Sequence, residues 1–314
     1  MYTLKIFGKC TILFVILHIT LYLKDLMRNR SKLPIVALIY DFDGTLAAGN
    51  MQEYSFIESV GEKKEDFWGQ TSVMAEAQDS DNVLVYMLLM LEKAKEMGIP
   101  IRKESLRKFG EDVKLFNGVK EWFRRISDFG MDHGVIVEHY INSSGMKEMI
   151  EGTPIADEFK TIFASSYYYD ANGDAQWPAA AVNYTNKTQF LYKINKGIFT
   201  IRDSVKINES MPDSKKRVPF TNMVYFGDGE TDVPCMKLIK QMGGNTIAVY
   251  EPKNERKREV AKKILNQDRC DYVCPADYSP GKNLDTLVKG IICKIKADDD
   301  LKKLKMEFKK KGYR

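Results

Sequence analysis

The chain has 314 residues, of which 44% are hydrophobic and 29% are charged, and its formal net charge is +5. This composition is typical of a globular protein and excludes a disordered or fibrous one. The charge is too small to argue for nucleic-acid binding, and none is expected. The length allows one large domain or two of ordinary size.

Residues 1–33 are an N-terminal extension with a strongly apolar stretch, CTILFVILHITLYL, at 10–23. The stretch is shorter than the about 20 residues that span a bilayer, and it contains His18. Three interpretations stay open: a signal anchor, an amphipathic docking helix, or an upstream extension of the gene model, with Met27 as the natural start. We favour a dispensable extension and a cytoplasmic protein, with membrane anchoring as the alternative. Membrane contact is expected only through residues 1–23.

The five cysteines are irregularly spaced, at Cys10, Cys235, Cys270, Cys274 and Cys293. Cys270 and Cys274 lack a second pair of ligands nearby, so a zinc site is not expected. Free thiols in a reducing compartment are the expectation.

The hydrophobic pattern predicts strands that alternate with helices. Four short apolar runs, rich in β-branched residues and ending in polar ones, are expected to be buried strands. They lie in 32–45, 134–145, 222–232 and 245–251. A strand with a hairpin turn at Asn172-Gly173 is expected in 159–176, and a short strand, a loop and a closing helix in 270–295. This alternation predicts an α/β fold with a parallel sheet covered by helices on both faces.

Residues 47–114 interrupt the alternation, because their apolar residues recur at three- and four-residue spacing and no strand is indicated. We expect a helical insertion above the sheet, with 34–46 and 115–296 forming the core. The remaining residues, 297–314, form a basic tail that includes LKKLKMEFKKKGYR at 301–314. The tail is interpreted as a solvated terminal helix or a frayed end, and binding of acidic lipid or RNA is the alternative.

Polar side chains stand where three of the expected strands end, and in open parallel sheets ligands bind beyond this edge. They are Asp41 and Asp43, Ser143 and Ser144, and Asp228 and Asp232. Residues two apart on a strand face the same side, so Asp41 and Asp43 can address one ligand. With Asp228 they place up to three carboxylates in one crevice, which requires a cation. Mg²⁺ is the hard, oxygen-binding ion that fits best.

Several other sites are excluded by their patterns. A calcium loop needs glycine at its sixth position, where Leu46 and Val233 stand. In GDGETD, Asp232 occupies the place of the third glycine of a dinucleotide fingerprint, and no P-loop motif occurs. The three histidines form no catalytic pattern, and His139 is expected to be a strand residue with satisfied hydrogen bonds.

Four motifs in order resemble the haloacid dehalogenase-like hydrolase superfamily, most closely its phosphoserine-phosphatase-like members. They are DFDGT at 41–45, INSSG at 141–145, a lysine in YTNKTQF at 184–190 and GDGETD at 227–232. The resemblance covers about residues 34–295 and implies a Rossmann-like core. The helical insertion after the first motif resembles the all-helical (C1-type) cap of that superfamily.

The resemblance implies a Mg²⁺-dependent phosphatase that hydrolyses a small phosphorylated metabolite through an aspartyl-phosphate. It makes Asp41 the nucleophile and Asp43 the general acid and base. Mg²⁺ would bind the Asp41 carboxylate, the Asp43 backbone carbonyl and Asp228, with Asp232 as a further or water-bridged partner. The residues implied to bind phosphate are Gly44, Thr45, Ser143, Ser144 and Lys187.

The choice of lysine and the type of reaction stay open. Lys193 and Lys196 compete with Lys187, which lies near a helix start, whereas the other two are expected to be exposed to solvent. A phosphomutase or phosphotransferase would use the same residues. A catalytically idle module that binds a partner or a membrane is the alternative from another class. The oligomeric state is not predicted.

The substrate is not specified by the motifs. Selectivity is expected from the insertion and from the segment SSYYYD at 165–170, of whose tyrosines at most one or two can face the site. Aromatic residues at helical spacing are more often core than substrate contacts. Those in the insertion are Tyr54, Phe56, Phe67, Trp68 and Tyr86. No arginine cluster indicates a carboxylate-bearing substrate, so phosphoserine itself is not supported.

Overall fold

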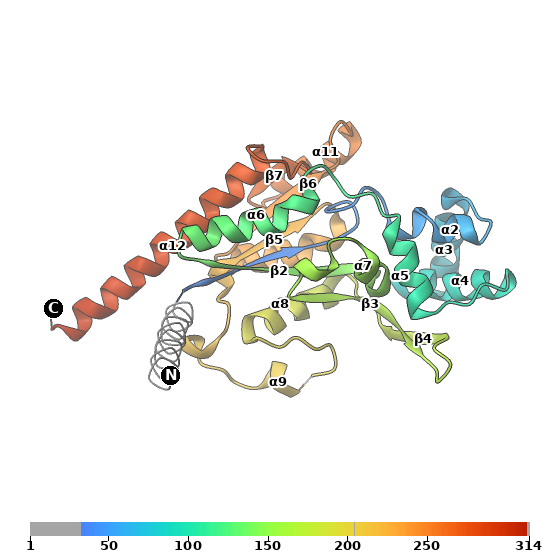
Figure 1. Ribbon diagram of the computed structural model, residues 1–314, viewed down its shortest axis with the longest axis horizontal. Coiled ribbons are helices and arrows are strands. Elements are labelled where there is room, and N and C mark those ends of the chain that lie inside the picture. Colours follow the sequence, from blue (N-terminus) through green and yellow to red (C-terminus); the bar gives the residue numbers. More distant parts are fainter. Residues whose placement is uncertain (1–32, 204, 313–314) are drawn as a thin grey trace, which may run out of the picture.

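A computed structural model describes residues 33–203 and 205–312, and within them seven strands form one sheet (Figure 1). The strands are β1 (Ile35–Tyr40), β2 (Ile136–Met146), β3 (Thr161–Tyr169), β4 (Ala175–Ala180), β5 (Met223–Gly227), β6 (Asn245–Tyr250) and β7 (Tyr272–Pro275). Their order is β4-β3-β2-β1-β5-β6-β7. Neighbouring strands are parallel except in the β3–β4 hairpin, whose turn contains Gly173. The predicted α/β fold with a largely parallel sheet is confirmed.

β1 lies at the centre of the sheet, between β2 and β5. Its side chains are buried from Val36 to Tyr40. Alternate residues enter different layers, since Leu38 and Tyr40 belong to one apolar cluster and Ala37 and Ile39 to the other. A strand that is covered on both faces needs a continuous apolar run, which explains the sequence IVALIY.

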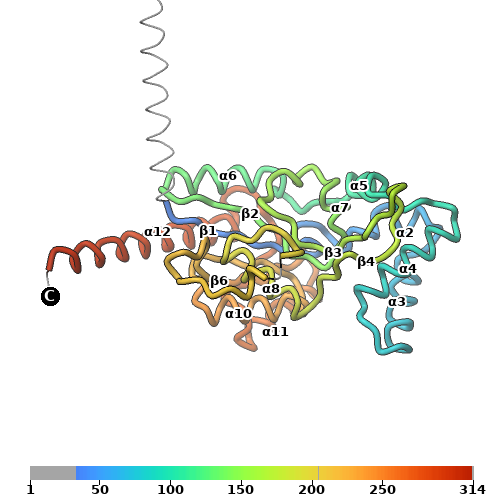
Figure 2. Tube along the Cα trace, turned by 90° about the horizontal axis from the view of Figure 1, so that it is seen from below, coloured from blue at the N-terminus to red at the C-terminus, as the bar shows by residue number. Residues whose placement is uncertain are grey.

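Helices cover both faces of this sheet (Figure 2). One layer contains α6 (Val119–Asp132), α7 (Lys147–Gly152) and α12 (Asn283–Lys310). The opposite layer contains α8 (Lys187–Lys196), α10 (Val233–Gln241) and α11 (Glu255–Asn266). The remaining short helices outside residues 47–114 are α9 (Val205–Asn208), η2 (Ala156–Glu158), η3 (Tyr184–Asn186), η4 (Asp213–Lys215), η5 (Phe220–Asn222) and η6 (Glu230–Asp232).

Residues 47–114 contain helices and no strand, and they lie beyond the carboxyl end of β1 (Figure 1). Their helices are η1 (Met51–Glu53), α2 (Phe56–Ser59), α3 (Lys64–Gln78), α4 (Asn82–Glu96) and α5 (Lys103–Glu111). Asp81 caps α4, because its carboxylate accepts hydrogen bonds from the backbone N–H groups of Val83 and Leu84. Phe67 and Met87 are buried in the same apolar cluster as Leu38 of β1, so the insertion packs directly on the core.

The C-terminal part of the chain is one long helix. The closing helix expected within 270–295 and the basic tail from 297 onward both lie in α12, which runs unbroken to Lys310. The predicted boundary between 296 and 297 therefore falls inside a helix.

The predictions for residues 1–32 lie outside the described residues. Among the helices between residues 33 and 312, none combines the length and apolar character needed to cross a bilayer. Four of the five cysteines lie in the described part of the chain, and all four are free thiols, as expected. Cys270 and Cys274 do not belong to any metal-binding cluster of the described residues.

A chain of hydrogen bonds links β1 to β2 inside the core. Trp122 Nε1 donates to the Tyr40 hydroxyl at 2.8 Å, and the Tyr40 hydroxyl lies 3.1 Å from His139 Nδ1. His139 Nε2 lies 3.1 Å from Ser127 Oγ and 3.2 Å from the Phe123 carbonyl oxygen, so both ring nitrogens have hydrogen-bond partners. Every group is satisfied while the imidazole is neutral, which confirms the expectation for His139. Burial lowers the pKa of His139 from 6.5 to about 3.

We expect His139 to make stability depend on pH in the acidic range. Because its pKa falls from 6.5 to about 3 on folding, the unfolded chain binds one proton more between these values, and stability is lost as the pH falls. From pH 6.5 to pH 5 the loss is about 2 kcal/mol. Urea unfolding of the wild type and of His139→Gln at pH 7 and pH 5 measures it. The difference in unfolding free energy between the proteins should shrink by this amount, and a constant difference would contradict the assignment.

Candidate active site

Three carboxylates predicted as site residues meet at the carboxyl ends of the central strands. Asp41 follows β1, Asp228 follows β5, and Asp232 lies at the end of η6, just before α10. One oxygen from each lies within 4.8 Å of the others. The Asp41 backbone N–H donates to the Phe226 carbonyl oxygen at 2.9 Å, which fixes the end of β1 against β5.

Lys187 is fully buried at the first position of α8 and faces two of these carboxylates. Its Nζ lies 2.6 Å from Asp232 Oδ1 and 3.2 Å from Asp41 Oδ1. The Asn142 side chain holds the start of α8 by donating to the Lys187 carbonyl oxygen at 3.1 Å, and the Tyr225 hydroxyl donates to Asp232 Oδ1 at 2.8 Å. Burial works to lower the pKa of Lys187, but the charges of Asp232 and Asp41 outweigh it and raise that pKa.

The two competing lysines bind backbone carbonyls instead. Lys193 Nζ donates to the carbonyl oxygens of Thr200 and Ile201, at 2.8 and 3.0 Å. Lys196 Nζ donates to that of Ile207 at 2.6 Å. The expected solvent exposure is wrong for Lys193, which is 1% exposed, because the loop after α8 folds back over its ammonium group. Of the three candidates, Lys187 is the one whose ammonium group lies at the carboxylates.

The protein's own cations do not neutralise the site. Burial raises the pKa of Asp41 to about 7, with a further increase from the charge of Asp232 and a decrease from Lys187. Burial and the charge of Asp41 raise the pKa of Asp43 well above its usual value. Burial also raises the pKa of Asp228, although Lys257 Nζ, 2.8 Å from its Oδ2, opposes this. The two ammonium groups therefore do not offset burial and mutual repulsion, and these carboxylates can all ionise only with further positive charge nearby.

The donor set fits a hard divalent cation such as Mg²⁺. Asp41, Asp228 and Asp232 offer oxygen ligands, and Asp232 Oδ2 is buried without a hydrogen-bond partner. The carboxylate of Asp43 is not part of this group, because its Oδ1 accepts a hydrogen bond from the Met51 backbone N–H at 2.9 Å. Of the four residues predicted to hold the metal, three bring their carboxylates together. Asp43 lines the same cavity, but its carboxylate lies outside this cluster.

Two glycines allow the carboxylates to approach the backbone closely. Gly44 has φ +72°, and a Cβ there would lie 2.3 Å from Asp228 Oδ2. A Cβ on Gly227 would lie 2.3 Å from Asp232 Oδ2. Gly44, predicted to bind phosphate, thus also makes room for Asp228.

The three predicted hydroxyl groups lie in different surroundings. Ser143 and Ser144 lie at the end of β2, where the pairing with β3 is irregular, and both line a cavity. Ser143 Oγ accepts from the Gly145 N–H at 3.0 Å, whereas Ser144 Oγ is buried without a partner. Thr45 is fully buried behind the cavity wall, where its carbonyl accepts from the Tyr278 hydroxyl. Its Oγ1 is also buried without a hydrogen-bond partner, and Thr45 is not among the residues that line the cavity.

The cavity has a volume of about 440 Å³ and lies between the strand ends and the helical insertion. The insertion contributes Gly49, Asn50, Gln52, Glu53, Trp68 and Tyr86 to its lining. Trp68 and Tyr86 were among the aromatic candidates, and Phe56 and Phe67 are buried core residues. None of Tyr167, Tyr168 and Tyr169 lines the cavity.

No family model matches the chain. An uncharacterized protein of Borreliella burgdorferi is 28% identical over 286 residues, which cover 82% of this chain and 97% of that protein. The HAD family hydrolase t0658 from Salmonella enterica serovar Typhi is similar in structure, with a TM-score of 0.50, 15% identity and coverage of 82% of this chain and 72% of that one. A substrate-bound phosphoserine phosphatase has a TM-score of 0.49, 13% identity and coverage of 81% and 97%.

The chain has the fold of the haloacid dehalogenase-like hydrolases. This confirms the fold that the four motifs predicted. In this fold the motif residues Asp41, Lys187, Asp228 and Asp232 come from three separate segments, and the sheet order brings them to one edge.

Sequence reasoning missed several residues that line or contact the candidate site. Lys257 lies in the first turn of α11, the helix that follows β6, and forms an ion pair with Asp228. A search for charged residues after every predicted strand, β6 among them, would have identified Lys257 as a candidate. Gln52 and Glu53 follow the first motif by about ten residues and carry no motif signal. Gln52 Oε1 is buried without a partner, and Glu53 Oε1 accepts from Trp68 Nε1 at 2.9 Å.

We expect Gly44→Ala to destabilise the protein more than Gly61→Ala, although both glycines have φ +72°. The left-handed backbone costs an alanine about 1–2 kcal/mol at either position. A Cβ on Gly61 has no atom within 4 Å, whereas at Gly44 the Asp228 carboxylate must also move. We expect this to add about 1 kcal/mol or more.

Urea unfolding of the two variants with and without Mg²⁺ provides the measurement. We expect Mg²⁺ to stabilise the wild type and Gly61→Ala, and we expect Gly44→Ala to lose most of this stabilisation. Equal losses in both variants would show that Asp228 does not constrain residue 44.

Proposed function

We propose that the chain is a Mg²⁺-dependent phosphatase that hydrolyses a small phosphomonoester through an aspartyl-phosphate on Asp41. One observation carries the proposal: the Asp41 carboxylate lies at a cavity, 3.2 Å from the ammonium group of Lys187 and in one cluster with Asp228 and Asp232. A nucleophilic carboxylate beside a fixed cation suits in-line attack on phosphorus, in which the Asp41–phosphorus bond forms as the ester P–O bond breaks.

Lys187 has two tasks in this mechanism. It favours the ionised form of Asp41, against the burial that raises the pKa of this carboxyl to about 7. It also offers a fixed positive charge to the oxygens of the transferred phosphoryl group. A Mg²⁺ ion held by Asp41, Asp228 and the Asp43 carbonyl would supply further neutralisation of the charge on the phosphate.

Asp43 is suited to general acid and base catalysis. Its raised pKa favours the protonated form, which can donate to the departing alkoxide and then, once ionised, accept a proton from the attacking water. The N–H that holds its Oδ1 belongs to Met51, the first residue of η1 in the helical insertion. The insertion thus positions the acid, and we assign to it the role of a cap over the leaving group.

The cap side of the cavity would select the substrate. Asn50, Gln52, Glu53, Trp68 and Tyr86 contribute amide, carboxylate, indole and phenol groups around the space next to Asp43. These groups favour a polar alcohol of modest size, because the whole cavity measures about 440 Å³.

We expect purified protein to release phosphate from p-nitrophenyl phosphate and from part of a panel of soluble phosphomonoesters. EDTA should abolish the release, and added Mg²⁺ should restore it. Asp41→Asn should lower kcat at least about a thousandfold, because no covalent intermediate can form. The exposed Asp268→Asn serves as the control and should keep full activity. Full turnover by Asp41→Asn would refute the mechanism, and transfer of phosphate to a second alcohol would identify a phosphotransferase.

The variant Asp43→Asn, assayed with two substrates, distinguishes protonation of the leaving group from attack of Asp41 on phosphorus. p-Nitrophenolate leaves without a proton, so this variant should release about one equivalent of it per site in a burst and then stall, since water is no longer activated. An alkyl phosphate needs the proton to leave and should give no burst. Stopped-flow absorbance and rapid-quench phosphate analysis measure the two. Equal burst sizes with both substrates would contradict the assigned role.

A further inference from the structure

The C-terminal helix α12 extends beyond the body of the molecule. Its first half packs on the core through buried residues such as Leu284, Val288 and Ile292. From residue 301 to residue 312 every residue is exposed. At about 1.5 Å per residue, the helical part of this segment is about 15 Å long. Figures 1 and 2 both show this end of α12 projecting away from the sheet and its helices.

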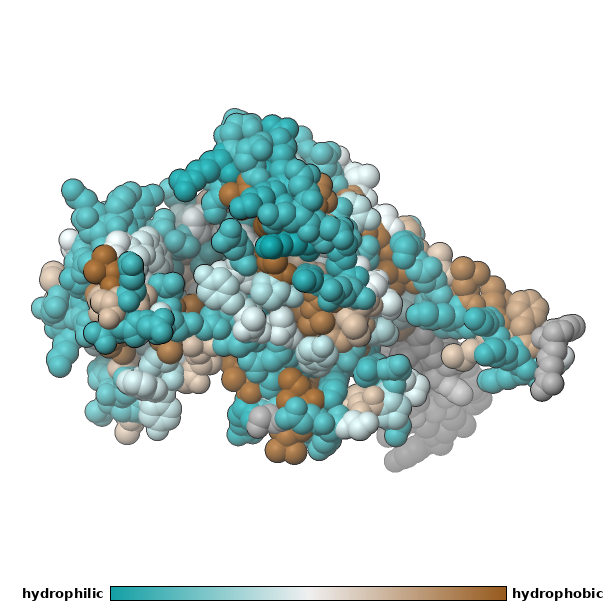
Figure 3. Space-filling model, turned by 180° about the vertical axis from the view of Figure 1, so that it is seen from behind, coloured by the Kyte–Doolittle hydropathy of each residue, from teal (hydrophilic) through white to brown (hydrophobic). Residues whose placement is uncertain are grey.

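The projecting end, residues 301–312, is both basic and apolar. It contains six lysines and one acidic residue, Glu307. Leu301, Leu304 and Phe308 are 64%, 48% and 55% exposed, and their spacing puts them on one stripe of the helix. Figure 3 shows hydrophobic and hydrophilic residues side by side on this end.

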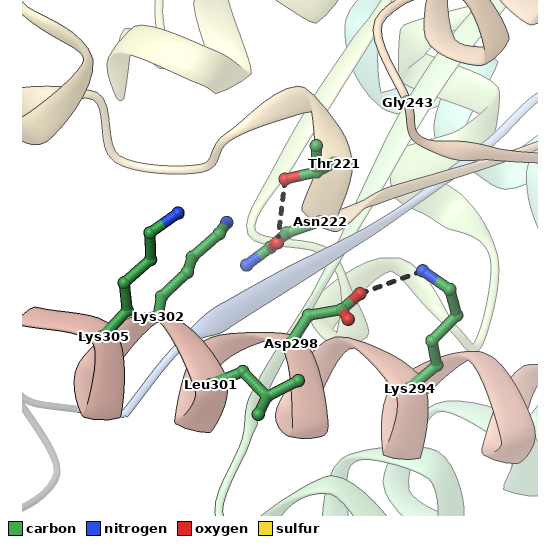
Figure 4. Close-up of a pocket in the computed structure, with 8 residues that line it drawn as sticks. All are labelled: Thr221, Asn222, Gly243, Lys294, Asp298, Leu301, Lys302 and Lys305. Atoms are coloured by element: carbon green, nitrogen blue, oxygen red, sulfur yellow. Dashed lines mark hydrogen bonds and ion pairs between the residues drawn. The ribbon is translucent and has the colours of Figure 1, made fainter.

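Two of its lysines reach over a groove at the base of the projecting end (Figure 4). The groove has a volume of about 350 Å³ and lies between α12 and the segments around Thr221 and Gly243. Asp298 on its wall is 2.9 Å from Lys294 Nζ, whereas Lys302 and Lys305 form no ion pair with any residue that the structure describes. Their ammonium groups are thus available to an external anion.

The projecting end lies at the edge of the sheet where β1 begins, opposite the candidate active site (Figures 1 and 2). The chain therefore enters the sheet on the same side, after a sequence that includes the apolar stretch 10–23 and the basic residues Lys24, Arg28 and Arg30. A flat surface bound here leaves the cavity at the other edge open to solvent.

We propose that the projecting end of α12 docks on an anionic lipid bilayer. Headgroup phosphates bind the lysines, and the stripe of Leu301, Leu304 and Phe308 enters the interface between headgroups and acyl chains. A second copy of the chain fits less well, because six lysines on each helix would repel. A nucleic acid would match the charge but leave the apolar stripe in water. The proposal takes up the acidic-lipid alternative that the sequence left open for the basic tail.

Cosedimentation of the full chain with vesicles tests this docking. One set contains phosphatidylcholine and phosphatidylglycerol at 7:3, and the other contains phosphatidylcholine alone. Replacing Lys302, Lys305 and Lys309 together by Gln should weaken binding to the anionic vesicles about a hundredfold, because each lysine near the surface contributes about a factor of five. Binding to the neutral vesicles, which reports contact through the N-terminal stretch, should not change.

The matched control replaces Lys95, Lys108 and Lys120 by Gln, which removes the same charge from exposed lysines outside α12. It should bind like the wild type. Leu301→Ser with Leu304→Ser keeps every lysine and should still lose at least about tenfold in anionic binding, since two leucines no longer enter the interface. Equal losses in the control and the α12 triple variant would overturn the proposal. So would a wild type that binds duplex DNA but neither set of vesicles.

Discussion

A single buried ammonium group, that of Lys187, is shared by the carboxylates of Asp41 and Asp232, and the arrangement of the site depends on this contact. A buried lysine without a partner would lose its proton or unfold the site, because transfer of an isolated charge from water is costly. The same holds for each carboxylate. Asp228 adds a further carboxylate, Asp43 lies nearby with a raised pKa, and Lys257 is the other cation in contact with the group. Burial and repulsion among these carboxylates are the reasons why this edge of the sheet suits a bound cation.

The fold holds the charges in place against their repulsion. Asp41 and Asp228 follow adjacent parallel strands, so backbone hydrogen bonds between β1 and β5 set their separation. Lys187 comes from the helical layer below the sheet, and Asn142 of β2 binds the backbone at the start of that helix. Gly44 lets the chain turn next to the Asp228 carboxylate. The register of the strands, the position of α8 and the absence of a side chain at Gly44 therefore fix the distances between the charged groups. A flexible loop could not maintain these distances.

Sequence patterns identified the parts of the site that depend on residues close together in the chain. They failed for residues whose positions are set by tertiary contacts. The apolar runs ending in aspartate predicted β1 and β5, and the motifs predicted which carboxylates meet there. Lys257 was missed because its partner Asp228 precedes it by 29 residues and meets it only through the pairing of β5 with β6. Lys193 was expected in solvent, but the loop after α8 supplies carbonyl oxygens that no helical periodicity reveals. The hydrogen bond from the Met51 N–H to the Asp43 carboxylate is likewise a contact that the sequence pattern does not reveal.

The proposed activity and the proposed membrane docking constrain each other, because the two regions lie at opposite edges of the sheet. Parallel strands place Asp41 and Asp228 of the candidate site at their carboxyl ends, and the projecting end of α12 leaves from the opposite edge. If lysines and leucines of α12 hold the protein on a bilayer, the cavity faces away from that bilayer. A phosphate on a lipid in the same membrane then cannot reach Asp41, because the sheet lies between them. Docking of this kind thus favours a water-soluble phosphomonoester, which agrees with a small cavity lined by amide, carboxylate and aromatic groups.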